Sequence, residues 1–282
     1  MKIHIFYHNG GEWHTWAPGM NYHFKPMSSS GLSSNPKTII EFVGVGFWRG
    51  SQAVLADVSF VVAAGETLVA LGRSGAGKTT ALKLINRLLD PTHGEVVVDG
   101  RSTTKWNAIA LRRAIGWMIQ ESGLFPHYTV EQNIAVVPKL EGWPADRVQA
   151  RVTELMELVG LAAGLRNRYP HQLSGGQRQR VGVARALAAD PQILLMDEPF
   201  GALDPITRVE MQRQFLALQQ RLRKTAVLVT HDLHEALLLG TKIALFDQGT
   251  LVGVFSKGEF TSSRNSRVRE YTEMFQASAL PS

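Results

Sequence analysis

The chain has 282 residues, of which 44% are hydrophobic and 19% are charged, and its formal net charge is +6. It contains no cysteine, which excludes disulfides, thiolate metal sites and cysteine nucleophiles. The apolar runs are far shorter than the ~20 residues of a membrane-spanning helix, and no run of Lys and Arg is dense enough to predict a nucleic-acid-binding stripe.

Residues 1–37 differ in composition from the rest of the chain. They are aromatic at first and then rich in Ser, Gly and Pro, which predicts a flexible N-terminal tail. Four of the nine histidines lie in this tail, at His4, His8, His14 and His23. A metal-binding tail is therefore an alternative, and translation that starts at Met27 is another.

From residue 38 onward, short β-rich runs alternate with helical patterns. The predicted strands are Thr38–Val45, Val58–Val62, Thr67–Leu71, Glu95–Val98, Ile115–Ile119, Ile193–Met196, Ala226–Val229 and Ile243–Phe246. Helices are expected after Gly77, from near Gly175, and over Ile206–Arg223. Continuous apolar strands alternating with helices predict an α/β sheet that is covered on both faces. We expect one domain over residues 38–260, followed by a short helix or tail over 261–282.

Between Thr129 and Leu173 the pattern is helical only. Apolar residues recur there at helical spacing and form one buried stripe, at Val148, Val152, Leu155, Met156 and Val159. This predicts a helical subdomain, over about residues 121–175, inserted into the α/β domain.

A phosphate-binding loop is predicted at Gly72–Thr79, whose sequence GRSGAGKT follows an apolar strand and precedes a helix. Its glycines let successive backbone N–H groups point at a phosphate, and the helix adds its positive N-terminal end. We expect Lys78 to pair with the β- and γ-phosphates and the Thr79 hydroxyl to bind Mg²⁺.

Two acids follow the apolar strand at 193–196. Asp197 suits Mg²⁺, directly or through water, and Glu198 suits activation of the water that attacks a γ-phosphate. An acidic pair is also common at solvated strand ends, but carboxyl ends of strands are where open α/β sheets bind ligands.

A second anion-receptive helix start is predicted at Leu173–Gln177, with the sequence LSGGQ. A simple Ser/Gly cap of a helix is the structural alternative. With this segment the chain resembles the ATP-binding subunits of ABC (ATP-binding cassette) transporters: LSGGQ matches the signature motif, Gln120 the Q-loop glutamine, Gly201–Asp204 the D-loop and His231 the switch histidine. The D-loop departs from the family pattern, since Ser is commoner than Gly at its first position.

The resemblance covers roughly residues 38–255. It implies a P-loop NTPase core with an antiparallel β subdomain and the inserted helical subdomain. It also implies a head-to-tail dimer, homologous or identical, in which Ser174, Gly175 and Gly176 serve the partner's ATP. Gln120 would sense the γ-phosphate and Mg²⁺, and Asp204 would communicate across the dimer.

The resemblance assigns four catalytic residues, Glu198, His231, Lys78 and Gln120, and three metal-binding residues, Thr79, Gln120 and Asp197. The expected ATP-binding residues are Trp48, Gly72, Arg73, Ser74, Gly75, Ala76, Gly77, Lys78, Thr79, Thr80, Ser174, Gly175, Gly176, Gln177 and Asp204. Of these, Trp48 is expected to stack on adenine, and a buried aromatic that packs on the core is its alternative.

Several longer segments, among them Leu84–Leu88, Glu121–Val130 and Glu198–Arg208, resemble the glycine betaine, choline and proline-type osmoprotectant importers. This resemblance implies a peripheral ATPase on the cytoplasmic face of the inner membrane, a separate permease and, indirectly, a solute-binding protein. The alternatives are an importer of another polar solute or a soluble ABC ATPase. Regulatory CBS modules, common in this group, are not expected in the residues after Phe255.

Overall fold

The computed structural model of the chain defines the backbone of residues 5–9, 12–16, 37–119 and 123–278, and the side chains of residues 37–119 and 123–275. The chain divides into two units, residues 1–35 and 36–282. In the first unit, β1 (Ile5–Asn9) and β2 (Glu12–Trp16) pair as an antiparallel hairpin that is not among the predicted strands. The other residues of this unit, with His4 and His23, lie outside the described residues.

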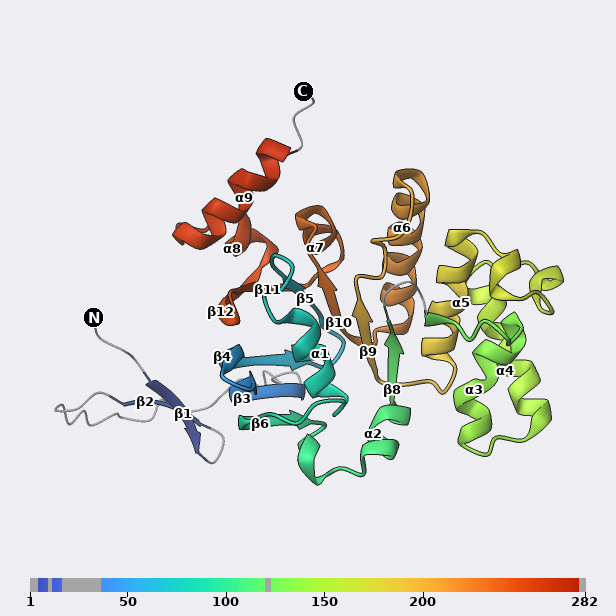
Figure 1. The fold of residues 1–282 in the computed structure, drawn as a ribbon, viewed down its shortest axis with the longest axis horizontal. Helices are drawn as coiled ribbons and strands as arrows, with labels where there is room; N and C mark the ends of the chain where they lie inside the picture. The colour runs from blue at the N-terminus through green and yellow to red at the C-terminus, as the bar shows by residue number, and fades with distance from the viewer. Residues whose placement is uncertain (1–4, 10–11, 17–36, 120–122, 279–282) are drawn as a thin grey trace, which may run out of the picture. The chain divides into compact units, whose positions relative to one another are not determined.

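The second unit contains a six-stranded sheet in the order β12-β11-β5-β10-β9-β8 (Figure 1). All neighbouring pairs are parallel except β11 and β12, which are antiparallel. The strands are β5 (Thr67–Leu71), β8 (Ile115–Met118), β9 (Ile193–Asp197), β10 (Thr225–Thr230), β11 (Lys242–Asp247) and β12 (Thr250–Ser256).

A separate four-stranded antiparallel sheet has the order β4-β3-β6-β7. Its strands are β3 (Thr38–Arg49), β4 (Gln52–Ala63), β6 (His93–Val98) and β7 (Arg101–Ser102). This sheet confirms the predicted antiparallel β part of the fold. All eight predicted strands are present, and among the described residues of this unit only β7 and β12 were missed.

The α-helices are α1 (Lys78–Ile85), α2 (Ala108–Ala114), α3 (Val130–Leu140), α4 (Ala145–Leu158), α5 (Gly175–Leu187), α6 (Pro205–Leu222), α7 (Leu233–Leu239), α8 (Lys257–Thr261) and α9 (Ser266–Ser278). Short 3₁₀ turns lie at Thr103–Lys105, Ala163–Leu165 and Pro170–Gln172. Among the described helices, none is long and apolar enough to cross a bilayer.

Strand β5 separates two hydrophobic cores. Val69 and Leu71 pack into the core that also holds α5, α6 and α7, whereas Leu68 and Ala70 pack into the core shared with α1 and the antiparallel sheet. Because successive side chains of a strand point to opposite faces, a strand that borders two cores buries side chains on both of its faces. This explains why β5, β9 and β10 are buried along their whole length.

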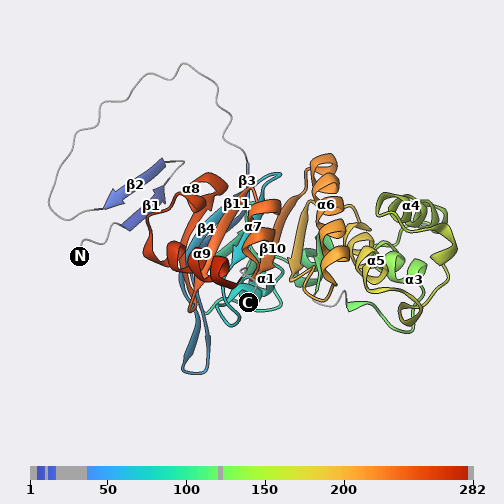
Figure 2. The same ribbon diagram turned by 90° about the horizontal axis from the view of Figure 1, so that it is seen from above.

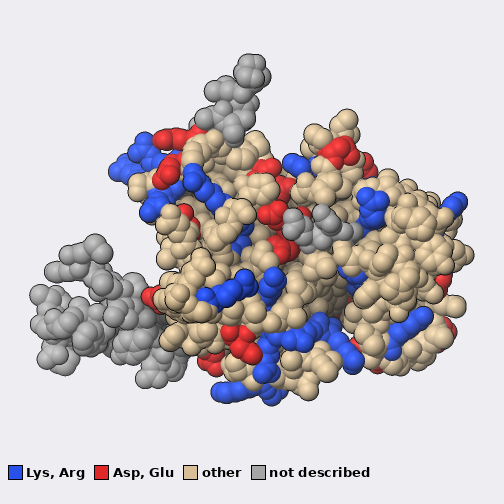
Figure 3. Space-filling model, in the orientation of Figure 1, with Lys and Arg blue, Asp and Glu red and all other residues tan. Residues whose placement is uncertain are grey.

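Helices α3, α4 and α5 pack together at one end of the unit, away from the antiparallel sheet (Figures 1 and 2). The predicted apolar stripe of this region is buried, with Val148, Val152, Leu155, Met156 and Val159 all at most 9% exposed. On the face drawn in Figure 3, Lys and Arg form separate patches with Asp and Glu between them. The described part of this face therefore has mixed charge.

Candidate active site

Three strand ends meet at one edge of the six-stranded sheet. Strand β10 lies between β5 and β9, with Thr230 beside Leu71 and Val229 beside Asp197. The loop after β5, the acids that end β9 and the residue after β10 therefore lie together. This edge, at the carboxyl ends of parallel strands, is where open α/β sheets bind ligands.

The loop Gly72–Gly77 turns sharply from β5 into α1. Gly77 has a left-handed φ of 95° and precedes α1 without any capping side chain. A Cβ at this position would lie 2.4 Å from Cδ2 of Leu55, so only glycine fits. Because no side chain caps α1, its first N–H groups are left for a ligand, and an anion suits that position.

The ammonium group of Lys78 lies across this loop. Its Nζ donates to the carbonyl oxygens of Gly72 and Arg73, both at 2.8 Å, and the side chain is buried. Burial lowers the pKa of Lys78, and the nearby charges of Glu198 and Asp197 act in the opposite direction. An ammonium has three donors, so one remains for a phosphate oxygen.

Thr79 and Asp197 form the most suitable pair of oxygen ligands for a cation. The Thr79 hydroxyl donates to Oδ1 of Asp197 at 2.9 Å, and Asp197 is only 8% exposed. Burial raises the pKa of Asp197, opposed by the Thr79 bond and the positive charges of Lys83 and Lys78. Mg²⁺ is commonly held by one or two such oxygens together with substrate phosphates, so these residues fit Mg²⁺.

Glu198 and His231 form a pair beside this site. Nδ1 of His231 lies 3.4 Å from Oε1 of Glu198. Glu198 has a φ of 44°, in the left-handed region that non-glycine residues rarely adopt, and its N–H donates to the carbonyl of Val229 at 3.0 Å. The unusual backbone turns the Glu198 side chain, which is 25% exposed, toward the imidazole. A carboxylate here can accept a proton from a bound water.

A buried polar network holds the loop that carries His231. The Thr230 hydroxyl donates to Oε2 of Glu235 at 2.5 Å, and the amide of Gln212 donates to Oε1 of Glu235 at 3.0 Å. The Asp232 N–H donates back to the Thr230 hydroxyl. Glu235 is 4% exposed, and burial raises its pKa. Glu235 was not predicted from the sequence, because an acid in the first turn of a helix is already explained by the helix dipole.

The predicted signature segment forms the start of α5. The Ser174 hydroxyl accepts from the N–H of Gln177, and the Gln177 side chain accepts from the N–H of Ser174. Asp204 caps α6 by accepting from the N–H of Thr207, and hydrogen bonds from the side chain and then the backbone of Thr207 lower the pKa of Asp204. A Cβ on Gly176 would lie 2.8 Å from Cγ2 of Thr207, so the two helix starts are in close contact.

A family model described as "ABC transporter" matches residues 55–201, which include the loop after β5, the start of α5 and the acids of β9. This match spans more than half of the chain. The chain belongs to the ABC transporter family. The sequence-based identification is confirmed, and so is the expected fold class.

Among its relatives is the osmoprotectant import ATP-binding protein OsmV of Salmonella typhimurium, 53% identical over 204 residues, which are 72% of this chain and 53% of the relative. The glycine betaine uptake system ATP-binding protein YehX of Escherichia coli is 51% identical over 214 residues, 76% of this chain and 70% of the relative. The chain thus spans about half of the first relative's length and more of the second's.

A solved structure with the same fold is the ATP-binding cassette MJ0796, a dimer in a post-hydrolysis state bound to ADP and Pi. It is 31% identical to this chain, with a TM-score of 0.70, and the match covers 78% of this chain and 99% of that one. Nearly the whole fold of this smaller cassette is therefore present in the chain described here.

The residues predicted for the site fall into two groups in space. The loop Gly72–Thr79, Asp197, Glu198 and His231 meet at the sheet edge. The segment Ser174–Gln177 does not join them, since α5 lies with α3 and α4, apart from α1 (Figure 1).

Three predicted residues stand outside this grouping. Trp48 is 44% exposed near the turn between β3 and β4, while its neighbour Phe47 packs against the core; its predicted role on adenine stays a prediction. Thr80 lies half-buried in the first turn of α1. Gln120 lies outside the described residues.

Proposed function

We propose that this chain is the ATP-hydrolysing subunit that powers import of a quaternary-amine osmoprotectant through a separate membrane permease. Two observations support the proposal. The sheet edge gathers a phosphate loop, a lysine, a buried aspartate and a Glu–His pair. The relatives that match at 51–53% identity are named as ATP-binding proteins of osmoprotectant import and glycine betaine uptake.

Each residue of the edge has one role in the proposed hydrolysis. Lys78 and the N–H groups of the loop bind the β- and γ-phosphates of ATP. Thr79 and Asp197 hold Mg²⁺, which neutralises phosphate charge when bound. Glu198 orients and deprotonates the attacking water. His231, whose Nδ1 lies 3.4 Å from Oε1 of Glu198, holds the γ-phosphate and the attacking water.

The active unit in this proposal is a dimer. Ser174–Gln177 offers a second helix start that the chain's own phosphate loop does not use, so we assign it to the ATP of a partner chain. The dimeric, nucleotide-bound state of MJ0796 supports this assignment. The chain would work as a peripheral protein on the cytoplasmic face of the inner membrane, next to its permease and, indirectly, a solute-binding protein.

The permease contact is proposed for the segment after Gln120. Phe125 is 42% exposed and Tyr128 is 37% exposed, and their rings cluster with that of His127 at centroid distances of 4.7–6.2 Å. The amide of Asn133 holds this loop by bonds to the carbonyls of Phe125, Tyr128 and Thr129. Crosslinks from Phe125 or His127 to the permease are expected in an assembled complex.

The proposal is tested by ATP hydrolysis of the chain reconstituted in liposomes with the permease encoded beside it, with and without glycine betaine or choline and the binding protein. We expect solute to stimulate hydrolysis, and Glu198→Gln to reduce it at least about 10²-fold, because a proton-transfer group is lost. Hydrolysis that does not respond to these solutes would reject the proposed class of transported solute but not the proposed ATPase activity. Near-normal turnover of Glu198→Gln would reject Glu198 as the base.

A further inference from the structure

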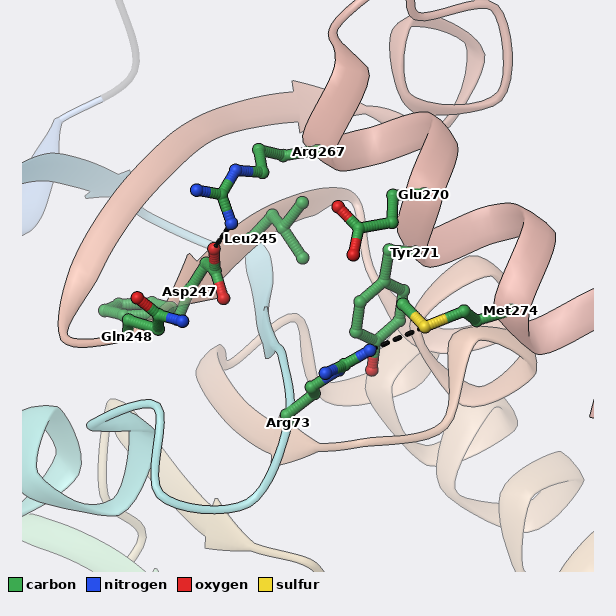
Figure 4. Close-up of a pocket in the computed structure, with 9 residues that line it drawn as sticks. Arg73, Leu245, Asp247, Gln248, Arg267, Glu270, Tyr271 and Met274 are labelled. Atoms are coloured by element: carbon green, nitrogen blue, oxygen red, sulfur yellow. Dashed lines mark hydrogen bonds and ion pairs between the residues drawn. The ribbon is translucent and has the colours of Figure 1, made fainter.

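Helix α9 lies directly against the hydrolytic site, although it is distant from the site in sequence. A cavity is lined by Arg73, Ser74, Glu198 and His231 of the site, and by Tyr271, Met274 and Phe275 of α9. Figure 4 shows the adjoining pocket, where Arg73, Tyr271 and Met274 point toward one another. The helix therefore forms one wall of the space in which a γ-phosphate and its water would lie.

The hydroxyl of Tyr271 makes the most specific of these contacts. It donates to the backbone carbonyl of His231 at 2.8 Å. Burial raises the pKa of Tyr271 to about 12, helped by the negative charge of Asp232 and opposed by Arg73. The hydroxyl therefore keeps its proton at neutral pH and remains a donor to this carbonyl.

Two neighbouring contacts fix α9 on both sides of this bond. Nη2 of Arg73 donates to the sulfur of Met274 at 2.6 Å, which ties the helix to the phosphate loop. The ring of Phe275 packs edge-on against the ring of His234, which lies in the first turn of α7, at a centroid distance of 5.2 Å. The helix thus bridges the phosphate loop and the loop that carries His231.

Packing alone does not require the Tyr271 hydroxyl. Val268 is 1% exposed and joins the hydrophobic core, and Arg267 forms an ion pair with Asp247 at the end of β11. These residues anchor α9 without touching His231. The hydroxyl of Tyr271 instead donates to the backbone carbonyl of His231, whose imidazole lies beside Glu198.

We propose that Tyr271 is a positioning residue for hydrolysis: its hydroxyl holds the His231 backbone directly, while the Thr230–Glu235 and Asp232–Thr230 bonds hold the residues on either side of His231. The inference rests on the proposed ATPase function. It predicts that loss of the hydroxyl lets the imidazole leave its place beside Glu198, while the phosphate loop keeps its geometry.

The test is Tyr271→Phe in the full chain, which keeps the ring and removes one hydrogen bond. We expect kcat for ATP to fall about three- to tenfold, the range for one lost hydrogen bond, with the KM and the Kd of a fluorescent ATP analogue unchanged. Thr272→Val is the matched control, since the Thr272 hydroxyl donates only to the carbonyl of Val268 within α9. We expect the control to keep kcat, and the two variants to have similar melting temperatures, because each loses one hydrogen bond.

A double-mutant cycle distinguishes positioning of His231 from a general loss of stability. If Tyr271 acts through His231, Tyr271→Phe has no further effect on single-turnover hydrolysis in a His231→Ala background. Equal losses in both backgrounds would overturn the inference, as would an unchanged kcat in Tyr271→Phe. A wild-type chain without ATPase activity would instead reject the proposed function, so the two failures are distinguishable.

Discussion

The two glycine-containing helix starts of this chain are built in opposite ways. The start of α1 has no capping side chain and is reached through a left-handed glycine, whereas the start of α5 is closed by the reciprocal Ser174–Gln177 box. The sheet edge around α1 also buries Lys78, Asp197 and Glu235, while Ser174 is exposed. The first region is therefore an anion site prepared within one chain, whereas the second satisfies its own donors, and we have assigned it to the nucleotide of a partner chain.

The largest expected effect comes from removing the charge of the prepared site. Lys78→Ala should reduce ATP hydrolysis at least about 10²-fold, because the ammonium that neutralises the phosphates is lost. It should also weaken ATP binding by the single chain, measured by titration with a fluorescent analogue. Unchanged binding would show that the loop before α1 is not the primary phosphate site, and it would contradict the difference described between the two helix starts.

The next largest effect tests how much the buried Glu235 network contributes to stability. Glu235→Ala should lower the free energy of unfolding by about 2–4 kcal/mol, because the buried hydroxyl of Thr230 and the amide of Gln212 lose their partner and a cavity opens. Chemical denaturation measures this loss. Glu154→Ala, which removes an exposed acid paired with Arg151, is the control and should cost less than about 1 kcal/mol.

A smaller effect is expected at the start of α5. Ser174→Ala should reduce hydrolysis about tenfold while the ATP affinity of the isolated chain stays the same, because we assign this serine to the nucleotide of a partner chain. The control is Ser256→Ala, which opens the equivalent capping box of α8, a helix start to which no nucleotide is assigned. Each variant should lose about 1 kcal/mol of stability, but only the first should lose activity. A fall in single-chain ATP affinity in Ser174→Ala would contradict the assignment.

The smallest effect is a pH dependence at Glu235. Since burial raises the pKa of this carboxyl, the folded state favours its protonated form. The stability that protonation contributes is present below the ordinary pKa of glutamate and is lost as pH rises through the folded value. Glu235→Gln cannot titrate, so the stability of wild type relative to this variant should decrease from acidic to neutral pH. A pH-independent difference in urea unfolding would contradict this.

The strands and helices around the sheet edge could be predicted from the sequence, but the side-chain contacts that hold the loop of His231 could not. β5 was predicted to the residue, because a strand between two cores is largely apolar, as it is after Thr67. The predicted range of α6 was one residue late at each end, and the helix ends at Leu222 because Arg223 has a left-handed φ of 48°. β12 was missed because its residues are mostly half-buried, so no alternation marks it. Glu235 and Tyr271 were missed because their partners, Thr230, Gln212 and His231, are identified only by folding.

Gly72 and Gly75 differ in a way that matters for mutational scanning. Gly72 has a φ of 156°, and a Cβ there would lie 2.3 Å from the carbonyl oxygen of Phe246, whereas the α-carbon of Gly75, with a φ of 80°, faces open space. In a library selected only for folded, expressed protein, position 72 would still return glycine, while position 75 would accept asparagine, which tolerates left-handed backbone. Intolerance at position 72 therefore reports a steric constraint of the scaffold, and only position 75 reports selection by nucleotide.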